Sequence, residues 1–408
     1  MKQFIRFAPL VLLVLSCTST PPLQQLKDDV AYLASDALEG RKTGTQAEIK
    51  AAEYIAARFD EIGLNSKGTE GFLQPFRFKP AKDPHSEASF SATDQEGYIT
   101  GVNVIGFHNN NAENTVVIGA HYDHLGYGGE GSLYRDSVPA IHNGADDNAS
   151  GVATLLTMAS NRKKLGRQNN YLFIAFSGEE MGLLGSNYFV KNTTITSASI
   201  NYMINMDMVG RLKEDNALAV YGVGTTPLFN QTLNANNTSF KLVLNESGIG
   251  PSDHTSFYLN DIPVLHFFTG QHEDYHKPSD DAETLNYEGM FSLSEYLLKV
   301  INALDRNGKL AFRATKNESE ETPRFTVGLG VVPDYLYDGK GMRIDGVSEG
   351  KIAQKVGLQK GDIVIGLGSS EITTLMEYMK ALSAFKKEDQ TTVTIQREGV
   401  DLTFEITF

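Results

Sequence analysis

Apolar runs of strand length alternate with helical patterns over the first three quarters of this 408-residue chain. The strand-like runs are TVVIGAH, YLFIAF, INYMINMD and IPVLHFF, which begin at residues 115, 171, 200 and 262. Between and after them, VATLLTMASNRKKL and MFSLSEYLLKVINAL have apolar residues at helical spacing, and residues 22–63 contain two more helical patterns that end at Gly63. Continuous apolar strands interleaved with helices are typical of an α/β domain with a buried sheet. We predict a mixed, largely parallel sheet with helices on both faces.

The α/β pattern ends near residue 310. The following stretch RATKNESEETPR is polar and has almost no hydrophobic residues, as expected of a linker. Short strand patterns, turn glycines and one helical pattern, TLMEYMKALSAF, come after it. We predict a first domain over residues 17–310, a linker over 311–321 and a small β-rich domain over 322–408.

The N-terminal segment predicts export. Lys2 and Arg6 precede an apolar stretch that is too short to span a bilayer, so residues 1–16 are typical of a signal sequence. Cys17, the only cysteine of the chain, lies where cleavage would occur, and VLSC resembles a bacterial lipobox. The resemblance implies lipid attachment at Cys17, and Thr18 after it implies the outer membrane. A secreted protein with an incidental cysteine is the alternative.

The charge of the chain excludes one class of partner. Its 50 acidic and 36 basic residues give a net charge of −14, and no dense basic run is present. Nucleic-acid binding needs a basic face, so we expect no nucleic-acid partner.

Polar residues follow each predicted strand at its carboxyl end, where an open α/β sheet binds its ligands. Their side chains are metal-ligand or proton-transfer types: His121, Asp123, Asp146, Asp147, Glu179, Glu180, Asp207 and His276. Carboxylates gathered at one place repel one another unless a cation is present. Mixed histidine and carboxylate ligands suit zinc, and manganese or cobalt can occupy the same set. A solvated acidic mouth without metal is the alternative.

Six motifs carry a resemblance to a known family. HYDH, GADDNASG, SGEEMGLLGS, NMDMVG, SDHTSF and YHKPSDD lie within residues 22–305. In order and spacing they resemble the motifs of the secreted co-catalytic di-zinc aminopeptidases, a family that also contains glutamate carboxypeptidase II and the glutaminyl cyclases. The resemblance implies two zinc ions per chain and hydrolysis of the N-terminal residues of peptides.

The resemblance also implies the metal ligands. His121 and Asp207 would bind one metal, and Glu180 and His276 would bind the other. Asp147 would bridge both metals, and a cis peptide bond would follow it.

Three further residues would take part in catalysis by the same resemblance. Glu179 would be the general base for a water activated by the two metals. Asp123 would hydrogen-bond His121, since residues i and i+2 of a strand point the same way. Tyr275 would steady the tetrahedral intermediate.

Other polar residues near these motifs are predicted to have supporting roles. We expect His124 outside the ligand set, His142 and His272 in loops, His254 in the pocket wall, His266 in the core, Arg211 in an ion pair and Asp146 orienting the bridging loop.

The C-terminal segments RFTVGLGVV, MRIDGVSEGKIAQKVGLQKGDIVIGLG and TTVTIQREG resemble a PDZ domain. Gly328, Leu329 and Gly330 resemble the loop whose backbone amides receive a peptide carboxylate. The resemblance implies a peptide or protein C-terminus as partner. A domain that packs on the peptidase and binds nothing is the alternative.

The leading prediction is an exported zinc aminopeptidase acting on peptides. A glutaminyl cyclase is less favoured because those enzymes line their pocket with tryptophan and this chain has none. A carboxypeptidase or dipeptidase stays open, because no residue is identified that would bind a free amine or carboxylate. A non-catalytic peptide-binding protein acting through the PDZ-like domain would require lost ligands, and all five ligand positions are present.

Overall fold

The computed structural model describes most of the chain. The described residues are 20–80, 89–93, 95–316, 326–337, 339–348 and 350–408. The predicted signal sequence 1–16, Cys17 and the later part of the predicted linker lie outside them, so export and lipid attachment stay predictions. Among the described residues, no helix combines the length and the apolar character needed to cross a bilayer.

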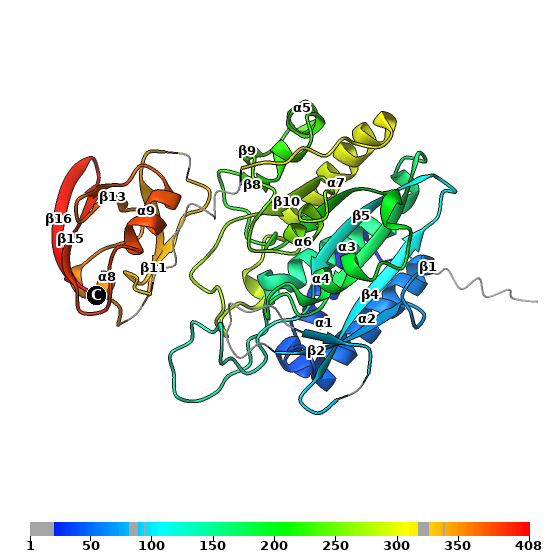
Figure 1. The fold of residues 1–408 in the computed structure, drawn as a ribbon, viewed down its shortest axis with the longest axis horizontal. Helices are drawn as coiled ribbons and strands as arrows, with labels where there is room; N and C mark the ends of the chain where they lie inside the picture. The colour runs from blue at the N-terminus through cyan, green and yellow to red at the C-terminus, as the bar shows by residue number, and fades with distance from the viewer. Residues whose placement is uncertain (1–19, 81–88, 94, 317–325, 338, 349) are drawn as a thin grey trace, which may run out of the picture.

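A ten-stranded sheet forms the centre of the first domain (Figure 1). Its order is β3-β2-β4-β6-β5-β7-β10-β8-β9, with β1 paired to β4. The strands are β1 Asn65–Ser66, β2 Leu73–Lys79, β3 Ser89–Ser91, β4 Ile99–His108, β5 Asn114–His121, β6 Asn169–Phe176, β7 Ile200–Met206, β8 Ala217–Tyr221, β9 Lys241–Asn245 and β10 Val264–Phe268.

The sheet is mixed, as predicted, but less parallel than the sequence indicated. Strands β6, β5, β7 and β10 are parallel neighbours, and β8 pairs with β9 in the same sense. The pairs that involve β1, β2, β3 and β4 are antiparallel, as is the pair of β8 with β10. The strands predicted from continuous apolar runs are the four central parallel ones, which are buried on both faces. Strands β4 and β8 are also largely buried, and no prediction was made for them.

Helices cover both faces of the sheet, which confirms the predicted layers. One face packs on α1 Pro22–Leu33, α2 Gln46–Ile62, α3 Gly151–Ser160, α5 Leu228–Asn236 and α7 Tyr287–Leu304. The other face packs on α4 Leu184–Lys191 and α6 His254–Tyr258. Short segments of 3-10 helix lie at Asp36–Arg41, Arg162–Lys164, Ser197–Ser199, Val223–Thr225, Ala282–Thr284 and Asp305–Asn307.

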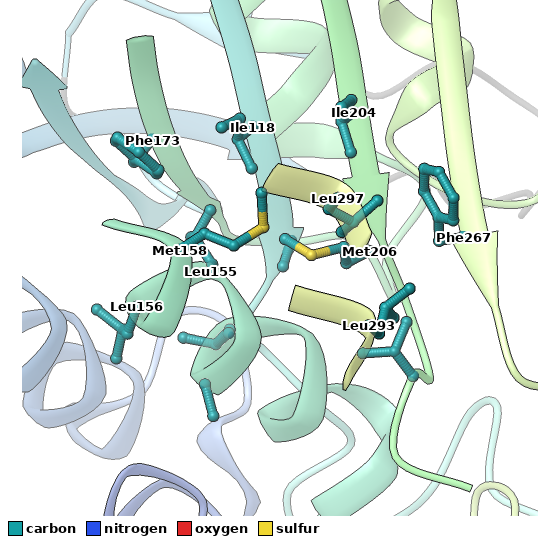
Figure 2. Close-up of a cluster of buried hydrophobic side chains, with 14 of the residues drawn as sticks. Ile118, Leu155, Leu156, Met158, Phe173, Ile204, Met206, Phe267, Leu293 and Leu297 are labelled. Atoms are coloured by element: carbon teal, nitrogen blue, oxygen red, sulfur yellow. The ribbon is translucent and has the colours of Figure 1, made fainter. Parts of the chain in front are cut away.

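The alternation of side chains along β5 produces these two layers. Val116 and Ile118 lie in the larger cluster beneath α3 and α7, whereas Val117 lies in the cluster beneath α4 and α6. Figure 2 shows the larger cluster, in which Leu155 of α3 and Leu293 of α7 meet the sheet. Burying each such side chain contributes about 1.5–3 kcal/mol to stability. Packing on both faces therefore fixes the central strands, and with them the positions of their carboxyl ends.

The C-terminal domain has a separate antiparallel sheet and its own core. Its order is β11-β12-β13-β15-β16, with β14 paired to β13. The elements are β11 Val331–Pro333, β12 Met342–Val347, α8 Ile352–Val356, β13 Ile363–Leu367, β14 Ser370–Glu371, α9 Leu375–Leu382, β15 Gln390–Arg397 and β16 Val400–Thr407. This sheet confirms the predicted β-rich domain.

The two domains are in contact beyond their covalent connection. Leu336, which is 4% exposed, packs with Ala219 and Phe268 of the first domain, and the rings of Tyr335 and Phe268 lie 6.0 Å apart. Lys213 Nζ also lies 2.8 Å from Asp345 Oδ2. This docking surface, formed by Tyr335 and Leu336, therefore lies against the end of β10.

The predicted linker begins as part of the first domain. Phe312 packs in the core beneath α6, and the Arg313 N–H donates to Thr225 O at 2.8 Å. The Thr315 N–H donates to the Tyr258 hydroxyl at 2.8 Å. Residues up to Thr315 are therefore held on the first domain.

Candidate metal centre

The residues predicted to form a site meet at one edge of the sheet. His121 is the last residue of β5, and Asp207 directly follows β7. Glu179 and Glu180 follow β6, and His276 lies in the loop after β10. Because β6, β5, β7 and β10 are adjacent and parallel, their carboxyl ends lie side by side. The fold thus brings together side chains that are up to about 150 residues apart in sequence.

Asp147 comes to the same edge from the turn Ala145–Ser150 that precedes α3. It is 4% exposed, and its peptide bond to Asn148 is cis, as the resemblance implied. The carboxylate of Asp280 accepts the N–H groups of Asp146 and Asp147 at 3.0 and 3.1 Å. Sequence reasoning gave Asp280 no role, although it is the first aspartate of YHKPSDD. A second acid close to a ligand histidine was the only signal.

Asp147 contacts two histidines, one with each carboxylate oxygen. Its Oδ1 lies 3.2 Å from His121 Nε2, and its Oδ2 lies 3.1 Å from His276 Nε2. His121 Nε2 is also 3.2 Å from Asp207 Oδ1, and His276 Nε2 is 3.3 Å from Glu180 Oε2. All five predicted ligands therefore form two groups that share Asp147, which is the arrangement expected of a bridging carboxylate.

His124, which was predicted to lie outside the ligand set, is in contact with the second group. Its Nδ1 is 2.7 Å from Glu180 Oε1 and 3.9 Å from Asp147 Oδ2. Ligand atoms of these three residues lie within 4.8 Å of one another, as do those of His121, Asp147 and Asp207. His124 is thus either a further ligand or the group that orients Glu180. The short contact to Glu180 Oε1 favours orientation, since that carboxylate presents its other oxygen to His276.

Asp123 supports the site differently from the prediction. Its Oδ1 is 3.7 Å from His121 Nδ1, which is too long for a hydrogen bond, and that ring nitrogen is nearer the backbone oxygen of Asp123, at 3.2 Å. The carboxylate instead accepts the Glu179 N–H at 3.1 Å and the Thr43 hydroxyl at 3.0 Å. Asp123 therefore fixes the turn that begins at Glu179. Thr43, which lies far upstream, was missed.

Glu179 and Tyr275 flank the two groups. Burial raises the pKa of Glu179 well above its usual value, and Asp207 and Glu180 add to this rise against the opposing effect of His121. The Tyr275 ring stacks on His276 with centroids 3.8 Å apart, and burial raises the pKa of its phenol well above the usual value. Tyr275 therefore keeps its proton at neutral pH.

Asp253 is a buried acid near the site that the sequence did not single out. It precedes His254 in SDHTSF and is fully buried. Burial raises the pKa of Asp253 to about 7, against opposing effects of His121 and Ser186. A motif residue next to a predicted pocket-wall histidine could have signalled it.

Of the other polar residues named from the sequence, His142, His266, His272, Arg211 and Asp146 lie in the predicted surroundings, whereas His254 is fully buried and its place in a pocket wall stays a prediction. His142 bonds to Ser132 in a loop at 2.8 Å, His254 and His266 stack in the interior at 4.4 Å, and Arg211 pairs with Asp274 at 2.9 Å. His272 Nε2 lies 3.2 Å from Asp146 Oδ2, and Asp146 Oδ1 accepts the Gly210 N–H at 2.6 Å.

In the predicted carboxylate-binding loop of the second domain, backbone carbonyl groups accept hydrogen bonds from the rest of that domain. Leu329 O accepts the Ala353 N–H, and Gly330 O accepts the Ser348 N–H, both at 2.8 Å. Gly330 has a φ of +79° and lies against Lys351, so a side chain would not fit there. The space beside Gly328 is open, because a Cβ there would meet no atom within 4 Å.

The donor set fits two divalent metal ions. Two groups of histidine nitrogen and carboxylate oxygen share one buried carboxylate, and these are the atom types that zinc prefers. Cations would also compensate the cost of burying several carboxylates close together.

The charges of the site shift the pKa values of its ligands. Burial works to lower the pKa of His276, but Glu180 and Asp147 raise it to about 11. Burial works to raise the pKa of Asp147, but hydrogen bonds from His121 and His276 hold it well below its usual value. His276 is therefore protonated at neutral pH beside ionised carboxylates, and a metal bound by His276 would have to displace that proton.

Comparison with known protein families agrees with this geometry. Residues 103–301 match the family model described as Peptidase family M28, and residues 310–408 match the PDZ domain. The first domain is therefore similar to peptidase family M28 over these residues, and the C-terminal part is similar to a PDZ domain, as the sequence predicted.

Individual relatives cover only part of the chain. Aminopeptidase YwaD of Bacillus subtilis is 31% identical over 170 residues, which cover 38% of this chain and 36% of the relative. The alkaline phosphatase isozyme conversion protein of Escherichia coli is 29% identical over 172 residues, which cover 41% and 46%. The chain thus spans less than half the length of these curated relatives.

Solved structures share the fold at low sequence identity. A zinc aminopeptidase from Bacillus subtilis aligns with a TM-score of 0.54 at 18% identity, covering 72% of this chain and 98% of that one. A glutaminyl cyclase from Bacteroides thetaiotaomicron aligns with a TM-score of 0.53 at 17% identity, covering 69% and 97%. Both show the same fold for the first domain.

We expect zinc binding near pH 7 to release protons, because His276 must lose its proton to become a ligand. For the same reason the zinc affinity should fall as the pH is lowered. Calorimetric titration in two buffers of different ionisation enthalpy measures the release. His276→Gln should release fewer protons than wild type, whereas His108→Gln, away from the site, should release as many. A binding heat that is the same in both buffers would contradict the assignment.

Proposed function

We propose that this chain is an exported, zinc-dependent aminopeptidase that binds two zinc ions and removes N-terminal residues from peptides. The observation that carries the proposal is the pair of ligand groups that share Asp147, with Glu179 beside them. Similarity to peptidase family M28 and the aminopeptidases among the relatives support it.

The residues present would divide the work of peptide hydrolysis. His121 and Asp207 would hold one metal, Glu180 and His276 the other, and Asp147 would bridge them. When bound, the metals would supply a water of lowered pKa and a Lewis acid for the scissile carbonyl.

Glu179 would move the proton. Burial raises the pKa of Glu179, so its carboxylate is a stronger base than that of an exposed glutamate. It would take a proton from the attacking water and deliver it to the leaving amine. The hydrogen bond from its backbone N–H to Asp123 would fix its position.

Tyr275 would assist at the oxygen of the scissile carbonyl. Its phenol stays protonated because burial raises its pKa, so it can donate a hydrogen bond to negative charge that develops there. Because the ring of Tyr275 stacks on that of His276, it would stay on one side of the group formed by Glu180, His276 and Asp147.

The PDZ domain would bind a peptide C-terminus. β11 pairs only with β12 in the described part of its sheet, which leaves an edge to which an extended peptide can add. Gly328, Leu329 and Gly330 precede this strand, and the open space at Gly328 would admit a carboxylate. Long substrates could then be held at both ends.

Export and anchoring complete the proposal. Residues 1–16 would direct export, and lipid on Cys17 would attach the mature protein to the bacterial outer membrane. Mass spectrometry of the mature N-terminus tests this, and an unmodified N-terminus would point to a secreted protein.

The activity is tested with protein that begins at residue 18. Metal analysis should find two zinc ions per chain, and cleavage of aminoacyl anilides should require a free N-terminus, stop on chelation and return with zinc. Cyclisation of N-terminal glutamine peptides without cleavage would instead identify a glutaminyl cyclase. Cleavage of N-acetylated peptides from the C-terminus would identify a carboxypeptidase. Failure to bind metal or turn over any substrate would leave peptide binding by the PDZ domain.

Glu179→Gln should retain both metals and lower kcat by at least about 10²-fold, because the amide cannot accept the proton from water. Metal content and kcat are measured on the same preparation. Glu273→Gln, an exposed neighbour of the site, is the control and should keep full activity. A metal-replete Glu179→Gln enzyme with wild-type kcat would refute the role of general base.

Deletion of residues 322–408 should lower kcat/KM for long peptides more than for aminoacyl anilides, because only long peptides can reach both domains. The full-length Leu336→Ser variant is the control, since it disturbs the docking surface while leaving the Gly328–Gly330 loop in place. An equal loss on both substrate classes would assign the PDZ domain a structural role.

A further inference from the structure

Arg41 is a buried cation whose role the sequence did not reveal. It is 1% exposed and lies in the segment between α1 and α2, upstream of the part that matches the M28 family model. In the part of the chain that the structure describes, its guanidinium has no carboxylate within ion-pairing distance. Burial lowers the pKa of Arg41 to about 10, so it is still protonated at neutral pH.

The guanidinium of Arg41 is bonded to backbone carbonyls alone. Its Nε donates to Tyr122 O at 2.7 Å, and its Nη2 donates to Gly144 O at 2.9 Å. Its Nη1 donates to Asn143 O at 2.6 Å and also to Leu33 O. One side chain thus satisfies four carbonyls from three separate segments.

Two of these segments carry metal-ligand candidates. Tyr122 lies between His121 and Asp123, and Gly144 begins the turn that contains Asp147. Arg41 therefore joins the backbone after His121 to the backbone before Asp147. These are the two residues whose side chains lie 3.2 Å apart in the first ligand group.

The backbone around Arg41 is packed closely against the same loops. A Cβ on Gly40 would lie 2.5 Å from His142 O and 2.7 Å from Gly126 O, so only glycine fits there. The Gly126 N–H also donates to Gly40 O at 3.0 Å. The backbone that carries the guanidinium is therefore tightly packed against these loops.

The residues after Arg41 support the site as well. Thr43 donates to the Asp123 carboxylate at 3.0 Å. Glu48, which is fully buried, accepts the Val102 N–H at 3.0 Å and the Ser177 hydroxyl at 2.5 Å. The segment from Arg41 to Glu48 thus contacts the loops after both β5 and β6.

We propose that Arg41 is a positioning residue that sets the separation of His121 from Asp147 and so determines zinc affinity at the ligand group they share. It acts through the carbonyls of Tyr122, Asn143 and Gly144 and does not touch the metal or the substrate. The inference rests on the proposed zinc site, but it concerns affinity and not turnover.

The test compares Arg41→Lys and Arg41→Met with Arg58→Met in the full-length mature chain. Arg58 is a matched control, because it is mostly buried, lies on α2 and pairs with Asp29 at 2.9 Å, away from the ligand groups. Zinc affinity is measured by competition with a chromophoric chelator, and stability by thermal unfolding of the metal-free protein. Both Arg41 variants should lose about 10–100-fold in affinity for one of the two zinc ions.

Lysine keeps the charge but cannot reach four carbonyls, so Arg41→Lys should not restore wild-type affinity. Arg58→Met should lower the unfolding temperature and leave both affinities unchanged. Folded Arg41 variants with wild-type zinc affinity would overturn the proposal, as would an equal loss of affinity in Arg58→Met. If Arg41→Met does not fold, Arg41→Lys decides by the same measurement. A wild-type protein that binds zinc but cleaves no peptide would refute the aminopeptidase alone, since the affinities still decide the role of Arg41.

Discussion

The sharing of one buried carboxylate by two histidines is the constraint on which the rest of the site depends. Asp147 presents one oxygen to His121 and the other to His276, so both histidines must approach from opposite sides. Further carboxylates must then lie within a few ångströms of a group that is already charged and buried, which is stable only with compensating positive charge. The parallel centre of the sheet satisfies this requirement, because adjacent strands deliver their next residues to one edge.

Side chains from distant segments form hydrogen bonds that hold the predicted ligands in place. Asp280 accepts the amides of the turn that carries Asp147, and Thr43 holds the carboxylate that fixes Glu179. Arg41 draws carbonyls of two ligand loops together. The carboxyl ends of the strands thus bring the predicted ligands together, while segments outside the sheet bond to the loops that carry them.

The central sheet, the five ligand positions and the second domain could be predicted from the sequence, because buried parallel strands leave continuous apolar runs and their next residues are readable. Strands β2 and β9 could not, since they are buried on one face at most. The distance of the Asp123 carboxylate from His121 and the contact of His124 with Glu180 could not be predicted, because the sequence does not record the orientation of side chains. Arg41 was missed because its partners are carbonyl groups, which every residue has.

The contact of Leu336 with Phe268 has a consequence for the reach of the PDZ domain. A module on a free tether samples many distances, and its local concentration near a target falls gradually with tether length. The second domain instead contacts the end of β10, and this contact would restrict the distance between the Gly328–Gly330 loop and the predicted metal ligands. A peptide bound by that loop would reach the predicted ligands only above a threshold length. The two-domain chain would then select substrates by their length.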